Sequence, residues 1–301
     1  MNMMHRVIGI GEILWDVFPD GPRFGGAPAN FSCSTSELAR NSVHVSIFSA
    51  VGDDDLGRQA IEALGTRGVD TSLIEVNNHS TGRVDIELDD TGVASYHFAE
   101  DSAWDHLQFD DAKRNAAAQC DAVCFGTLGQ RSDASRTAIQ AFVSATPPSC
   151  LRILDVNLRP PFVSDALIRT SLQIANVLKL NDDELPYLAK INEIGGSAIE
   201  VMRGLADRYQ LRFVALTRGS KGAIILSNDN ASDLAGRPVK VADTVGAGDA
   251  FTAAMTLGLL TGNDLDTVNR NAIEVASYVC SKQGATMSFP NHLQINPGLK
   301  S

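Results

Sequence analysis

The segment Asp243–Asp249, Asp-Thr-Val-Gly-Ala-Gly-Asp, directly precedes residues 250–260, a stretch of small and apolar residues that is typical of a helix. Glycines at a helix N-terminus leave peptide N–H groups bare, and these groups with the helix dipole favour an anion such as a phosphoryl group. The carboxylate of Asp249 could accept a proton from a hydroxyl nucleophile there. The pattern predicts phosphoryl transfer with Asp249 as base, and the alternative is a turn in which Asp249 caps the helix. The backbone expected to hold the anion belongs to Gly246, Ala247 and Gly248.

A second glycine motif lies near the other end of the chain. It reads Gly-Gly-Ala-Pro-Ala-Asn over Gly25–Asn30, and Gly-x-Gly-Glu over residues 9–12 precedes it. Together with Asp243–Asp249 it resembles the two signatures of the ribokinase-like carbohydrate kinases, the PfkB family. The resemblance implies one kinase domain over residues 1–301 with a three-layer α/β/α fold, a mainly parallel central sheet and a small β-sheet lid. It also implies ATP as phosphoryl donor, a small sugar as acceptor, Mg²⁺ and K⁺ as ions, and a homodimer formed through the lid.

The same resemblance assigns residues to the sugar. Asp16 would accept hydrogen bonds from sugar hydroxyls, although by itself it could be a turn residue. Gly26 lets the backbone approach the sugar, and Asn30 offers both a donor and an acceptor. Phe98 or Trp104 could cover the sugar and exclude water, or could pack within the lid instead. The full set of sugar-side positions is Asp16, Gly26, Asn30, Phe98, Gln130, Arg159 and Asp249.

Nucleotide and ion positions also follow from the resemblance. The segment Asn181–Glu184 is similar to the family's N-x-x-E motif, in which Glu184 helps to organise a hydrated Mg²⁺; taken alone, Glu184 could be a solvated residue of a first helical turn. The positions implied for ATP are Asn181, Thr217, Gly219, Gly222, Gly246, Gly248 and Asn271. Those implied for K⁺ are Asp243, Val245, Val279, Lys282, Gly284 and Ser288.

Short apolar runs alternate with amphipathic segments along most of the chain. This alternation predicts βα units and a mainly parallel sheet with helices on both faces. Ligands of such sheets gather at the carboxyl ends of strands, where Asp155–Arg159 and Asn181–Glu184 stand. The predicted strands are 7–10, 43–46, 122–125, 152–155, 177–180, 213–216 and 223–226. The predicted helices are 29–39, 57–67, 132–143, 166–174, 183–190, 197–209 and 250–260.

One region departs from the alternation. Val84, Ile86 and Leu88 are separated by polar residues, then comes the turn Asp89–Gly92, then residues 93–98. This pattern predicts a hairpin with one exposed face. With the excursion of residues 16–24 it predicts a small sheet that stands off the main domain, and we set the lid at about residues 14–25 and 82–105.

Composition excludes several classes of protein. The formal net charge of −11 argues against general nucleic-acid binding. No apolar run approaches the roughly 20 residues of a membrane span, and the N-terminal segment is not typical of a signal peptide. The 5 cysteines are scattered, so we expect reduced thiols in a cytoplasmic protein. The chain lacks a G-x-x-x-x-G-K-[ST] motif, which disfavours a P-loop enzyme.

The identity of the sugar rests on finer likeness. Segments 12–19, 27–31 and 125–131 resemble the fructokinase branch, which implies transfer to a primary hydroxyl, O6 of D-fructose, to give fructose 6-phosphate. Ala99 and Glu100 depart from that branch, whose members often carry a basic residue there. The alternatives are a kinase for 2-keto-3-deoxygluconate, ribose or a riboside, and a non-catalytic regulator that binds sugar or nucleotide.

Overall fold

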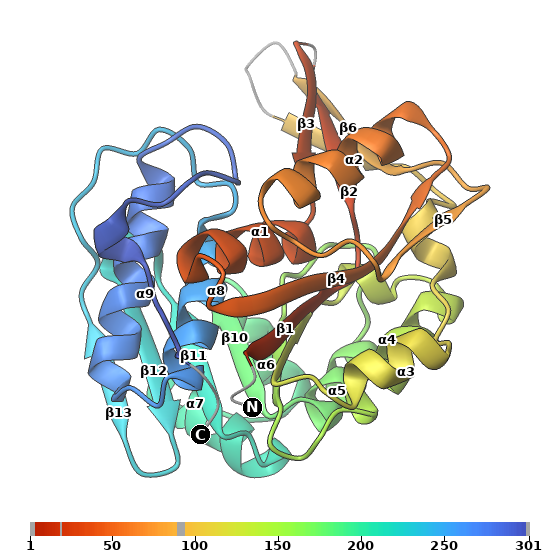
Figure 1. Cartoon of the computed structure of the whole chain (residues 1–301). Helices are drawn as coiled ribbons and strands as arrows, with labels where there is room; N and C mark the ends of the chain where they lie inside the picture. The colour runs from red at the N-terminus through yellow and green to blue at the C-terminus, as the bar shows by residue number, and fades with distance from the viewer. Residues whose placement is uncertain (1–3, 19, 89–93, 299–301) are drawn as a thin grey trace.

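A computed structural model describes residues 4–18, 20–88 and 94–298, which form a large central sheet, a small second sheet and helices on both faces of the large one (Figure 1). This is the predicted three-layer α/β/α arrangement with a mainly parallel central sheet. Within these described ranges, no helix has the length and apolar character needed to cross a membrane.

The large sheet has 9 strands, and their pairing is parallel from β5 across to β11 and antiparallel at the β11–β12–β13 edge. Interior strands are runs of buried apolar residues, as expected for strands covered on both faces. The edge strands β5 and β13 are partly exposed and less apolar, so the sequence pattern missed them. In spatial order the strands are β13 (Ala231–Leu234), β12 (Ala223–Ser227), β11 (Phe213–Thr217), β10 (Val177–Asn181), β9 (Leu151–Asp155), β8 (Ala122–Phe125), β1 (His5–Ile10), β4 (Val43–Gly52) and β5 (Ile74–Asn77).

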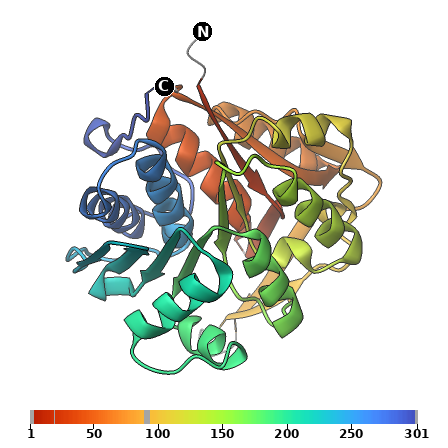
Figure 2. The same ribbon diagram turned by 90° about the horizontal axis from the view of Figure 1, so that it is seen from below.

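Two groups of helices cover opposite faces of this sheet, and Figure 2 shows them on either side of its strands. Each group packs its apolar side chains into one of two separate hydrophobic clusters. The first group is α1 (Ala27–Ala39), α2 (Asp55–Thr66), α8 (Ala247–Leu260) and α9 (Leu265–Cys280). The second is α3 (Asp111–Ala117), α4 (Asp133–Ser144), α5 (Asp165–Ile174), α6 (Leu185–Ile191) and α7 (Ala198–Tyr209). Short 3₁₀ turns are η1 (Ala103–His106), η2 (Leu128–Gln130), η3 (Gly219–Lys221) and η4 (Asn291–Leu293).

The small sheet stands above the large one in Figure 1 and has the order β3-β2-β6-β7. Antiparallel pairs β2–β3 and β6–β7 are joined through a parallel β2–β6 contact, so the sheet is mixed. Leu14, Val84, Ile86, Trp104 and Leu128 form its own hydrophobic cluster. The predicted turn at residues 89–92 lies outside the described residues. The strands are β2 (Leu14–Phe18), β3 (Gly21–Gly25), β6 (Gly82–Leu88) and β7 (Ala94–Phe98).

The helices of the first group begin in two different ways. Helix α2 starts at Asp54 and α9 at Asp264, and each carboxylate accepts a hydrogen bond from a backbone N–H of the first turn. Helices α1 and α8 start instead at Gly26 and Gly246, which have positive φ angles of 105° and 75° and offer no side-chain cap. The N-cap residues of α1 and α8 therefore supply no side-chain acceptor to the first N–H groups of these helices.

Candidate active site

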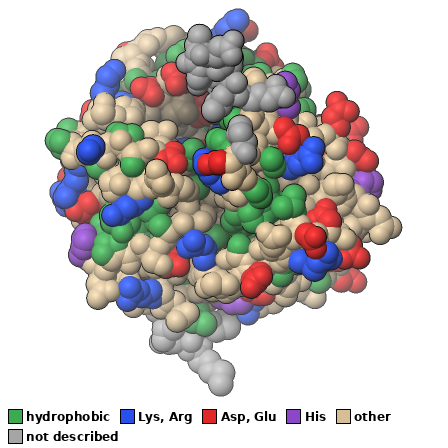
Figure 3. Space-filling view, turned by 90° about the horizontal axis from the view of Figure 1, so that it is seen from above, with side chains coloured by type: hydrophobic (Ala, Val, Ile, Leu, Met, Phe, Trp, Pro, Cys, Tyr) green, Lys and Arg blue, Asp and Glu red, His purple; other side chains and the backbone are tan. Residues whose placement is uncertain are grey.

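A cleft of about 1460 Å³ runs between the small sheet and the carboxyl ends of the central strands of the large sheet. Pockets for one small molecule usually hold roughly 300–1,000 Å³, so this cleft has room for two ligands. Asn157 and Arg159 line it beyond the end of β9, Asn181 at the end of β10 and Thr217 at the end of β11. On the face seen from above, basic and acidic side chains are interspersed among the described residues, without one large basic patch (Figure 3).

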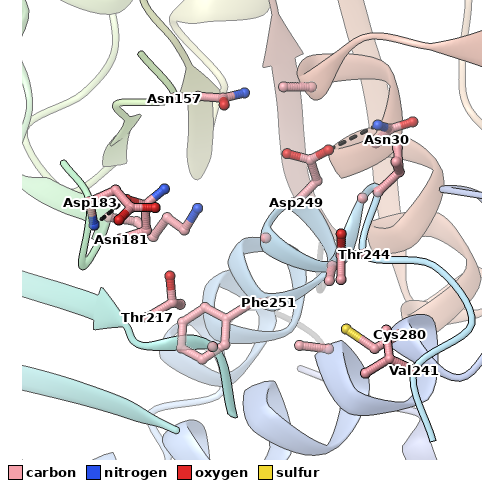
Figure 4. Close-up of a pocket in the computed structure, with 18 of the residues that line it drawn as sticks. Asn30, Asn157, Asn181, Asp183, Thr217, Val241, Thr244, Asp249, Phe251 and Cys280 are labelled. Carbon is pink, nitrogen blue, oxygen red and sulfur yellow. Dashed lines mark hydrogen bonds between the residues drawn. The ribbon is translucent and has the colours of Figure 1, made fainter. Parts of the chain in front are cut away.

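Asp249 lies in the first turn of α8 and faces this cleft. The amide of Asn30 on α1 donates a hydrogen bond of 2.9 Å to its carboxylate, and Figure 4 shows the two side chains pointing toward each other. Burial raises the pKa of Asp249 to about 6, and the negative charge of Asp155 adds to the increase. At neutral pH the carboxylate is therefore mostly ionised and can still accept a proton.

Of the two glycines before Asp249, Gly246 is required by its surroundings and Gly248 lies next to a cation. Gly246 has a φ of 75°, and a Cβ there would lie 2.7 Å from the Cβ of Ala285. At Gly248 a Cβ would lie 3.0 Å from the ammonium nitrogen of Lys179. Backbone N–H groups and a cation thus meet at one point of the cleft, which is the arrangement expected of an anion site.

Lys179 supplies that positive charge from inside the sheet. It lines the cleft from strand β10, and its Nζ lies 3.0 Å from a carboxylate oxygen of the buried Asp155. The other oxygen of Asp155 accepts a hydrogen bond of 2.8 Å from Thr252 on α8. Burial opposes the charge of Lys179, but Asp155 and other nearby carboxylates outweigh it and raise the pKa of Lys179. The lysine is therefore charged and held beneath the glycine loop.

The end of the cleft nearest the small sheet holds the predicted sugar-side residues Asp16, Gly26, Asn30, Phe98 and Arg159. A Cβ at Gly26 would lie 2.6 Å from a backbone oxygen, so only glycine fits this bend. Burial raises the pKa of Asp16, against the nearby Arg159 and Arg23. Phe98 packs edge-on against Phe162 with ring centroids 5.4 Å apart, and it forms an apolar wall of this end.

The other end of the cleft combines backbone donors with an apolar slot. Thr217, Gly219 and Gly222 line it around η3, as predicted for a nucleotide loop. No neighbouring atom lies within 4 Å of a Cβ built at Gly219, so the described structure leaves this backbone open to the cleft. The apolar slot opposite is formed by Val239, Val241, Val245, Ile273, Ala276 and Cys280. Val239, Val241 and Val245 are exposed, and together they form an apolar patch of the kind typical of ligand-binding grooves.

The sequence matches the family described as pfkB family carbohydrate kinase over residues 21–292. The chain belongs to the pfkB family of carbohydrate kinases. A fructokinase of Salmonella typhimurium is 30% identical to this kinase over 278 residues, which cover 88% of this chain and 87% of the relative.

Solved structures agree with the kinase fold. The crystal structure of an uncharacterized sugar kinase from Pyrococcus horikoshii is 27% identical to this kinase, with a TM-score of 0.80 and 93% of each chain covered. A second structure of that Pyrococcus protein is in complex with ATP. A fructokinase double mutant from Vibrio cholerae O395, with fructose, ADP and potassium ion bound, is 23% identical with a TM-score of 0.78 and 96% of each chain covered. At 23% identity, the similarity to the Vibrio cholerae protein shows a shared fold.

Among the positions predicted for sugar and ATP, Gln130 and Asn271 do not line the cleft. Gln130 is fully buried, and its amide donates to the carbonyl oxygen of Gly126 at 2.9 Å and to Ser171 at 3.0 Å. It joins η2 to α5 and does not line the cleft. The face of α9 that lines the cleft carries Ile273, Ala276, Ser277 and Cys280 instead of Asn271. At about 100° per residue, Asn271 points away from that face.

The open choice between Phe98 and Trp104 is also decided by their positions. Trp104 is 1% exposed and packs in the cluster beneath the small sheet, under the guanidinium of Arg131 at 4.0 Å from the ring centroid. Its role is packing. Phe98 alone of the pair lines the cleft.

The predicted ion residues of the kinase are engaged with backbone. Glu184 is 4% exposed, and its carboxylate accepts hydrogen bonds from the N–H groups of Leu158 at 3.0 Å and Asn181 at 2.8 Å. It joins two strand ends and does not line the cleft. The Asp243 carboxylate likewise accepts from the N–H groups of Val245 at 3.0 Å and Gly284 at 3.1 Å.

The remaining members of the predicted K⁺ set divide into two groups. Lys282 and Val279 belong to the turn that ends α9, next to Gly284, where the N–H of Lys282 donates to the carbonyl of Val279 at 2.9 Å. The hydroxyl of Ser288 donates at 3.4 Å to Glu37 on α1. The structure therefore brings the 243–245 and 279–284 loops together, whereas the side chain of Ser288 is directed to α1.

Glu12 is a cleft-lining residue of the kinase for which no role was predicted. It follows β1, it is 3% exposed, and its Oε2 has no hydrogen-bond partner among the described residues. Burial raises the pKa of Glu12 to about 7, against nearby backbone N–H groups and Arg159. Glu12 ends the Gly-x-Gly-Glu stretch, yet no role was predicted for it, whereas Lys179 was missed because a lysine within a buried strand has no motif around it.

Proposed function

We propose that this kinase transfers the γ-phosphate of ATP to a primary hydroxyl of a small sugar, O6 of D-fructose. The observation that carries the proposal is Asp249, a carboxylate with raised pKa in the first turn of α8, a helix whose N-terminus has no side-chain cap. The cleft extends from Asp249 toward Asp16 on one side and toward Thr217 on the other. Its two ends suit a polyhydroxylated acceptor and a nucleotide.

The proposed reaction uses Asp249 as general base. As the sugar oxygen forms its bond to the γ-phosphorus, the carboxylate takes the hydroxyl proton, and the bond from phosphorus to the β-phosphate oxygen breaks to release ADP. The N–H groups of residues 246–248 and the ammonium of Lys179 stabilise the negative charge on the transferring group. The hydrogen bond from Asn30 aims the carboxylate at the acceptor.

The oxygen donors along the middle of the cleft fit a hydrated Mg²⁺. Asn157, Asp182 and Asp183 line that region, whereas both carboxylate oxygens of Glu184 already accept backbone N–H groups. We therefore assign the contacts to the water molecules of Mg²⁺ to Asn157 and Asp183. Glu184 would hold the loops that carry these two residues. Bound there with ATP, Mg²⁺ neutralises phosphate charge.

The adjacent loops at 243–245 and 279–284 fit a K⁺ site built from carbonyl oxygens. Such a site would neighbour the anion-binding glycines, since Gly246 packs against Ala285. An ion there would hold the glycine loop in place. Dependence of turnover on K⁺ tests this assignment.

The small sheet is proposed to act as a lid over the sugar. Val84, Ile86, Tyr96 and Phe98 on β6 and β7 line the cleft, and Tyr96 is 60% exposed. Closure of these side chains over the acceptor would exclude water, which otherwise competes as phosphoryl acceptor. The fructokinase of Salmonella typhimurium, similar over most of the chain, supports fructose as the acceptor.

The deciding experiment measures ADP release from purified protein with Mg-ATP, with and without K⁺. The acceptor panel contains fructose, ribose, 2-keto-3-deoxygluconate and adenosine. We expect strong release with fructose. Strong release with another member would keep the mechanism and replace the substrate, and release with none would refute the kinase activity proposed for this chain.

A further inference from the structure

Outside the cleft, the side chains of His79, Asp101 and His106 converge at the base of the small sheet. Nδ1 of His79 lies 3.2 Å from one oxygen of Asp101, and Nε2 of His106 lies 2.6 Å from the other. All three ligand-type atoms lie within 4.8 Å of one another. The two imidazole rings are stacked, with centroids 3.5 Å apart.

The backbone that carries these side chains is fixed by other contacts. The Asn77 amide donates to the carbonyl oxygen of Ala103 at 3.0 Å, and the Ala103 N–H donates to the carbonyl oxygen of Ser80 at 2.8 Å. Asp105 is a buried residue of η1 and lies between Asp101 and His106 in the sequence. Its carboxylate forms an ion pair of 2.6 Å with Arg131. The cluster therefore sits on a braced support, although its own side chains reach the surface.

We infer that His79, Asp101 and His106 bind a divalent first-row transition-metal ion such as Zn²⁺. Two imidazole nitrogens and one carboxylate oxygen are a ligand set that such ions prefer, and water can complete the coordination.

Binding requires a small rearrangement of the rings. A shared ion must lie in the plane of each imidazole, so the rings have to turn from their present interplanar angle of 11°. His79 and His106 have side chains that are 35% and 38% exposed, which leaves room for this rotation. The ion then takes the place of the direct contacts between the two imidazoles and Asp101.

The position of the cluster gives the ion a mechanical effect. His79 precedes β6 and Asp101 follows β7, so the ion would join the segments by which this hairpin enters and leaves the small sheet. Phe98, at the end of β7, lines the cleft only a few positions before Asp101. Occupancy would therefore restrain β6 and β7 over the sugar end.

The test is titration of the full-length, chelator-treated protein with Co²⁺, followed by visible absorbance, and with Zn²⁺ in a calorimeter. We expect one ion per chain in the wild type. His79→Ala and His106→Ala should each weaken binding by about tenfold or more. His44→Ala is the matched control, because His44 pairs with Asp70 at 3.1 Å in an exposed pair that lacks a second histidine.

A second measurement follows hydrogen exchange at the amides of β6 and β7. Zn²⁺ should slow this exchange in the wild type and in His44→Ala, but leave it unchanged in His106→Ala. Equal affinity in wild type, His79→Ala and His106→Ala would overturn the site. Loss of binding in Asp249→Asn instead would place the ion in the cleft, and this result would also overturn it.

Discussion

Helices α8 and α9 pack against each other on the same face of the sheet, yet their N-termini are built for different purposes. At α9, Asp264 accepts hydrogen bonds from the N–H of Thr267 at 2.9 Å and from its hydroxyl at 2.8 Å. At α8 the corresponding place is taken by Gly246, and the first acidic side chain, Asp249, faces the cleft. A filled cap stabilises a helix, whereas an unfilled one keeps its donors for a ligand.

The largest effect on the contrast between the N-termini of α8 and α9 is expected when the carboxylate of Asp249 is removed. Asp249→Ala should lower kcat by about 1,000-fold, because the acceptor hydroxyl loses its general base. Nucleotide affinity, measured by calorimetry, should stay close to that of the wild type. Asp264→Ala is the matched control and should leave kcat unchanged. An Asp249→Ala enzyme with normal turnover would falsify the assigned base.

Filling the space before the same helix should have the next largest effect. In Gly248→Leu the new side chain would meet the Lys179 ammonium and cover the exposed N–H groups, so we expect kcat to fall by about 100-fold. Gly65→Ala on α2 is the control, since no atom lies within 4 Å of the added Cβ. The measurement is steady-state kinetics with saturating ATP. An equal kcat in Gly248→Leu and Gly65→Ala would contradict an anion site at residues 246–248.

The pH dependence of turnover sharpens the contrast between the two carboxylates. Because the pKa of Asp249 is raised to about 6, kcat should be constant above that pH and fall about tenfold per pH unit below it as the base becomes protonated. Asn30→Ala removes a hydrogen bond that lowers this pKa, so the inflection should move to higher pH. An inflection that stays in place in Asn30→Ala would contradict the contact.

The smallest effect is expected at the filled cap. Hydrogen bonds from Thr267 lower the pKa of Asp264, so its ionised form is the one that stabilises the folded state, and this stabilisation is lost as pH falls through the lowered pKa. Asp264→Ala should lower Tm by about 2 °C at neutral pH. Differential scanning calorimetry at neutral pH and near pH 3 checks this, because the difference should shrink in acid.

The sequence predicted the residues that line the middle of the cleft better than those around them. Asp249 and its glycines stand in a contiguous motif, and Asn181 and Thr217 follow apolar strands, so both their type and their place could be predicted. Asn271 could not be placed, because the rotation of α9 depends on how it packs. Gln130 reads as a polar residue after a strand, but its amide serves the interior of the fold.

Cleft residues without a local sequence pattern could not be predicted from the sequence. Lys179 lies inside a strand, and only the pairing of β9 with β10 brings it to Asp155. Val239 and Val241 form part of the apolar slot from an irregular segment that has no periodicity to detect. Such contacts arise from tertiary structure alone.

The hydrogen bond between Asn30 and Asp249 joins residues that are 219 positions apart in the chain. During synthesis on the ribosome, one half of the acceptor site emerges early, and the base that would activate the acceptor emerges only after most of the chain has been translated. An incomplete chain therefore has no assembled site in which to consume nucleotide. By the same reasoning, a ligand that contacts both residues binds only the fully folded molecule, and its binding would protect both ends of the chain from proteolysis together.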